Sequence, residues 1–394
     1  MGFNPRLVKI DSLPRAKQYL KEIGADEGGQ KYMQPKALFI TVKLDNLSLP
    51  AAAILKQEML SKGGEAAVHR ETITHKVDKT SVLLMGTIYQ YRKLIAKLKG
   101  QPFQLARLAN ELESLISNLT KDQKQKIDCV NGPLNLGERT YVMGIVNVTP
   151  DSFSDGGKYN QVDKAVEHAR RLVEEGADII DIGGESTRPG FTQVAAEEEL
   201  RRIIPVLKKL VPQINVPISV DTYKAEVGRR ALEAGAAIIN DIWGFQREPE
   251  LAKVAAEYDC PVILMHNQNG TEYHDLMGEL ILFLRKSIQI AESAGVATEK
   301  IIVDPGIGFG KDLDQNLEVM KRLDELKSLG KPVLLGTSRK SMIGQTLNLP
   351  ATEREEGTAA TIALGIAKGV DIVRVHNVKE MMRVVKMTDA MVRR

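Results

Sequence analysis

Short apolar runs alternate with longer amphipathic segments from about Tyr141 to the end of the chain. This alternation is typical of a parallel sheet whose strands are covered on both faces by helices. Eight runs fit the pattern. They are YVMGIVNV (141–148), DIIDIG (178–183), PISVD (217–221), AIIND (237–241), PVILMH (261–266), KIIVDP (300–305), PVLLGTS (332–338) and DIVRVH (371–376).

The segments between these runs have helical periodicity. The first repeats apolar residues at spacings of three and four, which marks one buried helix face. Three helices are expected to end on a glycine that takes the left-handed cap, at Gly176, Gly235 and Gly369. Eight units in about 255 residues predict an α/β fold, a (β/α)8 TIM barrel.

The first 130 or so residues have a different pattern. Strands are expected at 37–44, 65–73 and 80–88, and helices at 48–62, 89–100 and 103–119, which gives the order βαββαα. We therefore expect a small α+β domain at 1–125, a polar linker at 126–139 and the barrel at 140–394. No phosphate loop, metal spacing or nucleophile motif occurs in the first domain, so a structural, oligomerising or regulatory role is expected.

Composition narrows the function classes. A hydrophobic share of 43%, a charged share of 27% and a mean hydropathy of −0.18, without an apolar run near eighteen residues, argue against a membrane span. The net charge of +3 is spread over mixed charges, so a nucleic-acid partner is not expected. The first residues lack an apolar signal core, which makes the cytoplasm the default location. Cys129 and Cys260 are too few for a disulfide framework.

Polar residues follow nearly every apolar run. Because the loops after the strands carry the site of a (β/α)8 barrel, these residues are the candidates for chemistry. They are Asn147, the segment GGESTRPG (183–190), Asp221, Asn240 with Asp241, His266, Asp304, the segment SRKS (338–341), and Arg374 with His376.

Several of these residues have a structural alternative. Asp221 could cap the helix that begins near Tyr223. Asn240, Asp304 and Lys340 could satisfy one another, since an unpaired buried polar group costs about 1 to 3 kcal/mol. Together, however, two carboxylates, an amide and an ammonium at one barrel mouth favour binding of a flat heterocycle with many donors and acceptors.

Arg374 and His376 are two residues apart on a strand, so both side chains point to the same face. Two such groups suit an oxyanion or a diphosphate, although they could also face core carboxylates. The loop NVTPDSFSDGGKY (147–159) is longer than a turn requires, which indicates that it holds something.

These motifs together resemble the bacterial dihydropteroate synthases, a family of pterin-binding barrels inhibited by sulfonamides. The resemblance covers about 140–394 and is carried by GIVNVTPDSFSDGGKY, GADIIDIGGESTRPG, ISVDTYKAEV, IINDIWG, PVILMHN, IIVDPGIGFGK, LLGTSRKSMIG and VRVHNV. It implies condensation of 6-hydroxymethyl-7,8-dihydropterin diphosphate with 4-aminobenzoate to 7,8-dihydropteroate and diphosphate, with Mg²⁺ as cofactor. It also implies a homodimer.

The resemblance also implies roles for single residues. Asp221, Asn240, Asp304 and Lys340 would bind the pterin. Asn147 would hold Mg²⁺ and, with Thr187, Arg374 and His376, the diphosphate. The aminobenzoate pocket would be framed by Phe153, Ser154, Asp155, Thr187, Arg188, Pro189, Lys340 and Ser341. Asp155, Arg188, Lys340, Arg374 and His376 would act in catalysis. The loop from Asn147 would then be a lid over the site.

Two other functions share the pterin-binding residues. One is a methyltransferase of the same barrel class that moves a methyl group from methyltetrahydrofolate to a corrinoid protein. The other is a non-catalytic pterin-binding module. The lid, SRKS and the Arg374/His376 pair favour the synthase, because neither alternative needs a grip on a diphosphate.

Overall fold

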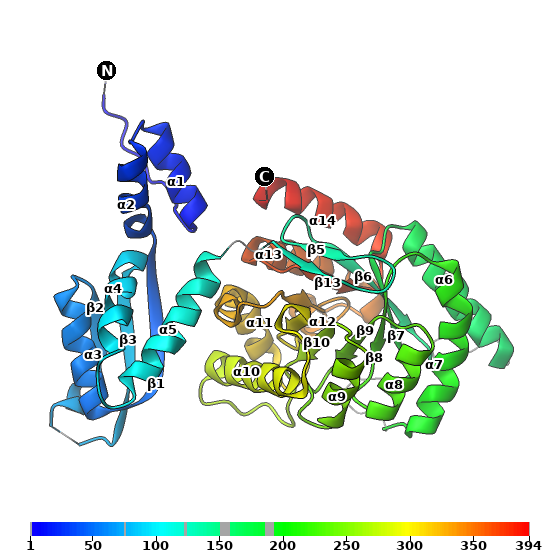
Figure 1. The fold of residues 1–394 in the computed structure, drawn as a ribbon. Coiled ribbons are helices and arrows are strands. Elements are labelled where there is room, and N and C mark those ends of the chain that lie inside the picture. The colour runs from blue at the N-terminus through cyan, green and yellow to red at the C-terminus, as the bar shows by residue number, and fades with distance from the viewer. Residues whose placement is uncertain (1, 75, 122–123, 150–157, 186–192, 394) are drawn as a thin grey trace. The chain divides into compact units, whose positions relative to one another are not determined.

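The computed structural model describes residues 2–74, 76–121, 124–149, 158–185 and 193–393. The chain divides into two compact units, Met1–Asp122 and Gln123–Arg394 (Figure 1). Among the helices described, none is both long enough and apolar enough to cross a membrane.

The N-terminal unit is an α+β fold around a three-stranded antiparallel sheet in the order β1-β3-β2. It contains the expected βαββαα order, preceded by two further helices. The elements are α1 (Leu13–Glu22), α2 (Glu27–Ala37), β1 (Phe39–Ser48), α3 (Leu49–Ser61), β2 (Glu65–Val68), β3 (Lys79–Thr87), α4 (Ile88–Leu98) and α5 (Leu105–Thr120). Helix α2 contains two glycines and Pro35, which lower helix propensity and explain why its sequence did not predict it.

One core holds this unit together. Along β3, buried Val82 and Leu84 alternate with more exposed neighbours, as expected for a strand with one covered face. Their side chains pack in the same cluster as Leu55 of α3, Tyr91 of α4 and residues of α5. The helices of this unit therefore cover the buried side of the sheet.

The second unit is a barrel of eight parallel strands, in agreement with the expected fold class. The strands follow the order β11-β10-β9-β8-β7-β6-β13-β12. They are β6 (Tyr141–Asn147), β7 (Ile179–Gly183), β8 (Ile218–Asp221), β9 (Ile238–Asp241), β10 (Val262–Met265), β11 (Ile301–Asp304), β12 (Leu334–Leu335) and β13 (Ile372–Val375). A parallel bridge between Val303 and Val333 links β11 to the residue before β12 and closes the barrel.

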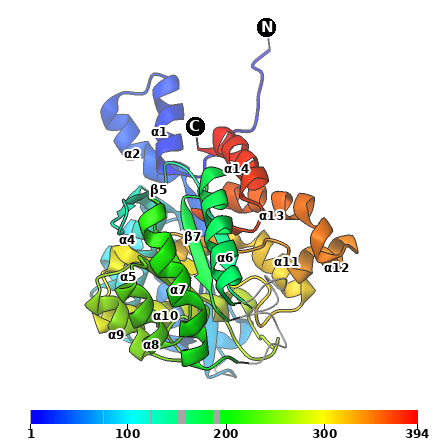
Figure 2. The same ribbon diagram turned by 90° about the vertical axis from the view of Figure 1, so that its right-hand side faces the viewer.

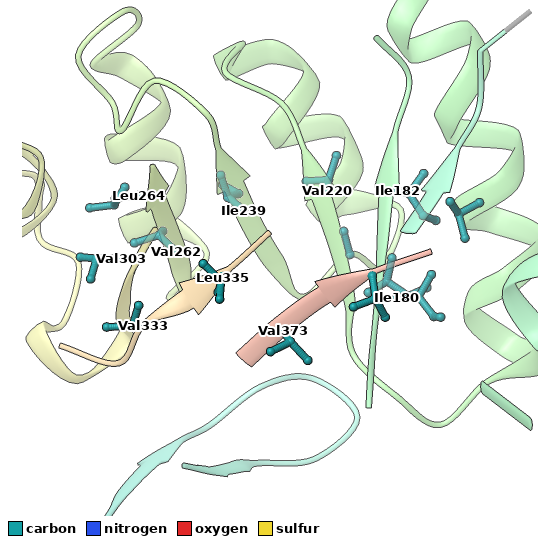
Figure 3. Close-up of a cluster of buried hydrophobic side chains, with 14 of the residues drawn as sticks. Ile180, Ile182, Val220, Ile239, Val262, Leu264, Val303, Val333, Leu335 and Val373 are labelled. Carbon is teal, nitrogen blue, oxygen red and sulfur yellow. The ribbon is translucent and has the colours of Figure 1, made fainter. Parts of the chain in front are cut away.

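Helices surround the strands (Figures 1 and 2). They are α6 (Lys158–Glu174), α7 (Ala196–Leu210), α8 (Ala225–Glu233), α9 (Glu250–Glu257), α10 (Leu276–Ala294), α11 (Leu313–Lys321), α12 (Ser341–Leu347), α13 (Glu355–Lys368) and α14 (Val378–Val392). Gly176, Gly235 and Gly369 have positive φ, so the three predicted glycine caps are confirmed. The main core lies between strands and helices, and Figure 3 labels residues of this core, among them Ile180, Val220 and Val373.

A short hairpin precedes the barrel. Its strands β4 (Gln125–Ile127) and β5 (Leu134–Leu136) pair antiparallel, and all but Gln125 lie in the range where the sequence suggested a linker. Ile127, Leu134 and Leu136 are buried in one cluster with Met143, Ile179, Ile263 and other residues from the amino-terminal halves of the barrel strands. The hairpin thus packs against the bottom of the barrel and leaves the opposite end for the site.

Candidate active site at the carboxyl ends of the strands

Alternation along each strand decides which side chains enter the barrel. Val220 and Val373 belong to the core beneath the helices. Their neighbours Asp221 and Arg374 must therefore point into the barrel, because successive strand residues face opposite sides. The same alternation sends Asp304 inward from β11, where Val303 faces the helices.

Strand register brings the polar tips together. Asn147 is opposite Gly183, Gly183 is opposite Asp221, and Asp221 is opposite Asn240, so these residues form one row across four adjacent strands. A Cβ atom added to Gly183 would lie 3.5 Å from the Cβ of Asp221 and 3.8 Å from Oδ1 of Asn147. The glycine therefore leaves open the space between these two polar side chains.

Asp221 is bound to Arg374 on the other side of the barrel. Nη2 of Arg374 donates a hydrogen bond of 2.8 Å to Oδ2 of Asp221. The other oxygen, Oδ1, is buried and has no hydrogen-bond partner among the described residues. Helix α8 begins at Ala225 with Lys224 at the cap position, so Asp221 does not cap it. An unpartnered buried carboxylate oxygen at a barrel mouth suits a ligand that donates hydrogen bonds.

A residue that the sequence did not single out joins this pair. Asp181 of β7 is fully buried, and it accepts a hydrogen bond of 2.6 Å from Nε of Arg374. Nδ2 of Asn240 lies 3.3 Å from Oδ2 of Asp181. The sequence did not single out Asp181, because it lies inside its strand and the candidates were the polar residues at strand ends. Period-two alternation could have identified it, since Asp181 lies two residues before Gly183 and therefore faces the same side of the strand.

Asp304 lies under the loop that follows β11. Its Oδ1 accepts a hydrogen bond of 2.7 Å from the backbone N–H of Gly306. Nζ of Lys340 lies 4.1 Å from the centre of the Phe309 ring, in the same loop. Gly306 is needed there, because a Cβ at this position would lie 1.9 Å from the backbone oxygen of His266. Asp304 and Lys340 therefore both contact the loop after β11, Asp304 through the Gly306 N–H and Lys340 through the Phe309 ring.

Lys311 holds this loop in place through hydrogen bonds to its backbone. Its buried ammonium donates to the backbone oxygens of Gly306 at 3.0 Å and Phe309 at 3.1 Å, and lies 2.9 Å from Nδ1 of His266. Burial lowers the pKa of Lys311 to about 7, and burial together with Lys311 lowers the pKa of His266 to about 3. A neutral His266 accepts the hydrogen bond from the ammonium. Thus His266, a candidate for chemistry from the sequence, is a packed residue that supports the loop.

The strands β12 and β13 supply the remaining described candidates. Nδ1 of His376 lies 3.0 Å from Oγ of Ser338. Arg339 adopts φ 58°, a left-handed conformation uncommon for residues other than glycine. This turn leads into Lys340 at the cap position of α12 and to exposed Ser341 at its first residue. Local backbone strain of this kind is often found at functional sites.

Burial dominates the electrostatics of the site. It raises the pKa of Asp221 to about 7, with Arg374 opposing the rise and Asp181 adding to it. It also raises the pKa of Asp304 to about 6, opposed by the Gly306 N–H and by Lys340. Two carboxylates, Asp181 and Asp221, share the single guanidinium of Arg374. The mouth thus favours a ligand that brings hydrogen-bond donors or positive charge to these oxygens.

Six predicted site residues lie outside the described part of the chain. They are Phe153, Ser154, Asp155, Thr187, Arg188 and Pro189. Within the described residues, no group of three His, Cys, Asp or Glu side chains could hold a metal ion. The donor set present, an Asn147 amide near the Asp221 carboxylate, fits an ion that takes most of its ligands from water and substrate phosphate, as Mg²⁺ does.

A depression of about 670 Å³ lies at the other end of the barrel, between the segments before β6 and β7 and helix α14. Four of its charged side chains form ion pairs: Arg139 binds Asp178, and Arg393 binds Asp389. The bottom of a (β/α)8 barrel serves stability, whereas the carboxyl ends of the strands carry the site. We therefore assign the active site to the strand tips.

The class of protein follows from a family comparison. Residues 143–376 match the model of the pterin binding enzyme family, a stretch that includes Asp221, Asn240, Asp304, Lys340 and Arg374. The barrel is thus a pterin-binding enzyme domain.

Individual relatives narrow the class. Dihydropteroate synthase of Clostridium beijerinckii is 58% identical over 261 residues, which cover 66% of this chain and 97% of that protein. A structure of dihydropteroate synthase from Clostridium difficile, solved in the presence of pteroic acid, has a TM-score of 0.65 and 55% identity, and covers 66% of this chain and 100% of that one. The chain therefore belongs to the dihydropteroate synthase family.

One relative also includes the N-terminal unit. A probable bifunctional folylpolyglutamate synthase/dihydropteroate synthase of Halobacterium salinarum is 41% identical over 388 residues, 97% of this chain. These residues make up 46% of that protein. The combination of the N-terminal unit with the barrel is therefore not peculiar to this chain.

Proposed function

We propose that this transferase condenses 6-hydroxymethyl-7,8-dihydropterin diphosphate with 4-aminobenzoate to give 7,8-dihydropteroate and diphosphate. The observation that carries the proposal is the buried cluster of Asp221 and Arg374, in which Oδ1 of Asp221 has no described partner. This one cluster offers an acceptor to a ring with N–H groups and a guanidinium to a departing anion. The family membership supports the same reaction.

Pterin recognition is assigned to the inward-facing row and the loop after β11. The amino group and N–H groups of the pterin meet the carboxylates of Asp221 and Asp304, while Asn240 offers both a donor and an acceptor. Lys340 and Phe309 are assigned to the same part of the pterin pocket, because the Lys340 ammonium lies over the Phe309 ring. Most of these contacts are hydrogen bonds to polar groups on the edge of the heterocycle, and a few such groups fix the orientation of a ligand in a small-molecule site.

The bond that breaks joins the exocyclic methylene carbon of the pterin to a diphosphate oxygen, and its electron pair leaves with the diphosphate. The displacement is dissociative, so positive charge develops on the methylene and spreads over the ring. Asp221 and Asp304 stabilise that charge, while Arg374 and His376 stabilise the departing anion. Asn147 would help to hold Mg²⁺, which would supply further neutralisation of the leaving group.

The amine nitrogen of 4-aminobenzoate then forms the new C–N bond and releases a proton. We place the aminobenzoate among Phe153, Ser154, Thr187, Arg188, Pro189, Lys340 and Ser341, with Asp155 beside the developing cation or the amine. Lys340 and Ser341 support this placement, because they lie at the start of α12 next to the pterin-reading loop. A closed lid from Asn147 excludes water that would otherwise trap the cation.

A corrinoid-dependent methyltransferase is not favoured. That reaction has no diphosphate leaving group, and the 58% identical relative is a dihydropteroate synthase. A non-catalytic pterin-binding module would need the pterin contacts but not the substrate-dependent release of an anion.

Turnover separates these functions. Purified full-length protein should release diphosphate only when the pterin diphosphate, 4-aminobenzoate and Mg²⁺ are all present, and dihydropteroate should accumulate in equal amount. Release of diphosphate without 4-aminobenzoate would point to hydrolysis, and tight pterin binding without release would point to a binding module. Phe153→Ala should raise the KM for 4-aminobenzoate more than the KM for the pterin; equal effects would contradict the assigned pockets.

A homodimer and a cytoplasmic location complete the proposal. Leu364 of α13 and Met387 and Met391 of α14 are exposed apolar side chains on two helices that pack together, which supports a contact between two copies. Light scattering after gel filtration should give about twice the mass of one chain. A monomer at micromolar concentration would refute the dimer without affecting the proposed reaction.

A further inference from the structure

Asp181 lies within its strand and not at the tip. It is fully buried, two residues before the end of β7. The arrangement allows it no direct exposure at the mouth, yet its carboxylate binds two groups that do reach the ligand site, Arg374 and Asn240.

Stability alone is a poor reason for this carboxylate. Removing a charge from water costs free energy, and replacing a buried ion pair by apolar residues is often neutral or stabilising. Ile179, two residues earlier and facing the same side of β7, packs in an apolar cluster at the bottom of the barrel. An apolar residue at position 181 could have continued that cluster. Stability therefore does not explain why a carboxylate at position 181 binds Arg374 and Asn240.

Orientation supplies the reason. A carboxylate only accepts hydrogen bonds, so Asn240 must turn its Nδ2 toward Asp181, and its Oδ1 points elsewhere. Arg374 gives Nε to Asp181 and Nη2 to Asp221, and among the described residues Nη1 has no hydrogen-bond partner. The two contacts fix the plane of the guanidinium and leave Nη1 for a ligand.

We propose that Asp181 is a positioning residue, which holds Arg374 and Asn240 in the orientation that binds the diphosphate and the ring of the pterin substrate. This inference rests on the proposed function. Asp181 itself touches neither substrate; it sets the direction of the donors on Arg374 and decides which end of the Asn240 amide is presented. A small misplacement of such groups reduces rate by up to about 10²-fold.

The test is Asp181→Asn in the full-length protein, which keeps the volume and removes the charge. The asparagine can both donate and accept, so Asn240 is free to turn, and Arg374 loses one carboxylate. We expect the KM for the pterin diphosphate and the inhibition constant of inorganic diphosphate each to rise about ten-fold or more, while the KM for 4-aminobenzoate changes less than two-fold.

Asp241→Asn is the matched control. Asp241 is also fully buried, on the neighbouring strand β9, but its carboxylate binds the backbone N–H groups of Trp243 and Phe245 at 2.7 Å each. This variant should lower the melting temperature and leave the ratio of the two KM values unchanged. If Asp181→Asn behaves in the same way, its role is structural and the proposal is wrong.

A second measurement keeps the proposal testable if Asp181→Asn folds poorly. Asp181→Glu retains the charge but displaces it by one methylene group, and should raise the inhibition constant of diphosphate by a smaller factor than Asp181→Asn. In an Arg374→Lys background, either substitution should change that constant less than three-fold, because the group being positioned is gone. Full effects in that background would overturn the inference. Wild-type turnover is measured first: if it is absent, the proposed function fails, and if it is present while Asp181→Asn matches it, only this inference fails.

Discussion

The N-terminal unit and the barrel differ in what they bury. Among the described residues of the N-terminal unit, no Asp, Glu, Lys, Arg or His is buried, and the buried polar side chains are Thr72 and Thr80, with the hydroxyl of Tyr91 bonded to the backbone oxygen of Leu84. Among the described residues of the barrel, nine Asp, Glu, Lys and His side chains are buried: Asp181, Glu199, Asp221, Lys224, Asp241, His266, Asp304, Lys311 and Asp371.

The buried charged side chains distinguish the barrel, which has a candidate site, from the N-terminal unit, where none was found among the described residues. A buried charge lowers stability unless it is fully paired, so an ordinary core avoids it, as the N-terminal unit does. Asp181, Asp221 and Asp304 of the barrel lie at or just below one mouth, and the partners of Asp221 are incomplete. The barrel accepts the cost where ligand binding can offset it.

The largest expected effect comes from Asp221→Asn. Removing the charge of one member of a buried charge pair costs about 2 to 5 kcal/mol, so kcat/KM for the pterin diphosphate should fall by about 30-fold to 5,000-fold. Steady-state kinetics of the full-length protein measure this change. Tyr91→Phe in the N-terminal unit also removes a buried hydrogen bond and should leave kcat/KM unchanged. A loss of less than three-fold in Asp221→Asn would remove Asp221 from the site.

Two core truncations test whether the units are stabilised separately. Leu55→Ala in the N-terminal core and Ile127→Ala in the hairpin beneath the barrel should each cost about 2 to 5 kcal/mol, because both side chains are fully buried. Calorimetry should show that each substitution lowers one transition, and that only Ile127→Ala reduces the temperature at which activity is lost. One shared transition that both substitutions shift equally would contradict separate cores.

The pH dependence of stability should also differ between the two units. Burial raises the pKa of Asp241 to about 7, above the value in the unfolded chain, although two backbone N–H groups oppose the rise. The folded barrel therefore binds this proton more tightly; the resulting stability is fully present below the unfolded pKa and is lost as pH rises through about 7.

The measurement compares melting temperatures of the wild type and Asp241→Asn from pH 5 to pH 8. The advantage of the wild type should be larger by a few degrees at pH 5 than at pH 8, because the variant lacks this proton. The transition of the N-terminal unit, which buries no described carboxylate, is the internal reference. A difference that does not change with pH would mean that Asp241 is already ionised throughout this range.

The smallest effect is expected from removal of the N-terminal unit. The Clostridium beijerinckii relative matches 66% of this chain over 97% of its own length, so a barrel without the unit is sufficient in that protein. A chain that begins at Gln123 should keep kcat/KM within about three-fold. A chain that begins at Gly132 is the control: it lacks β4 with Ile127 and should be less stable. A large loss of activity in the first would assign the N-terminal unit a part in the reaction.

Local pattern was enough to find the elements of the barrel. The apolar runs identified all eight strands, and the polar residues at their ends included Asn147, Asp221, Asn240 and Asp304, because alternation along a strand is a property of the sequence itself. The hairpin was not found. Its strands have three residues each, too few for an alternating pattern to stand out from a polar, turn-rich segment.

The sequence by itself determined which residues face the inside of the barrel, since period-two alternation fixes the side of the strand on which a side chain emerges. Only the tertiary structure decided which of these side chains meet. Arg374 lies 193 residues from Asp181 and 153 residues from Asp221 along the chain, and the three come together through strand register and barrel closure. Register and closure depend on packing across the whole barrel, so no local pattern encodes them.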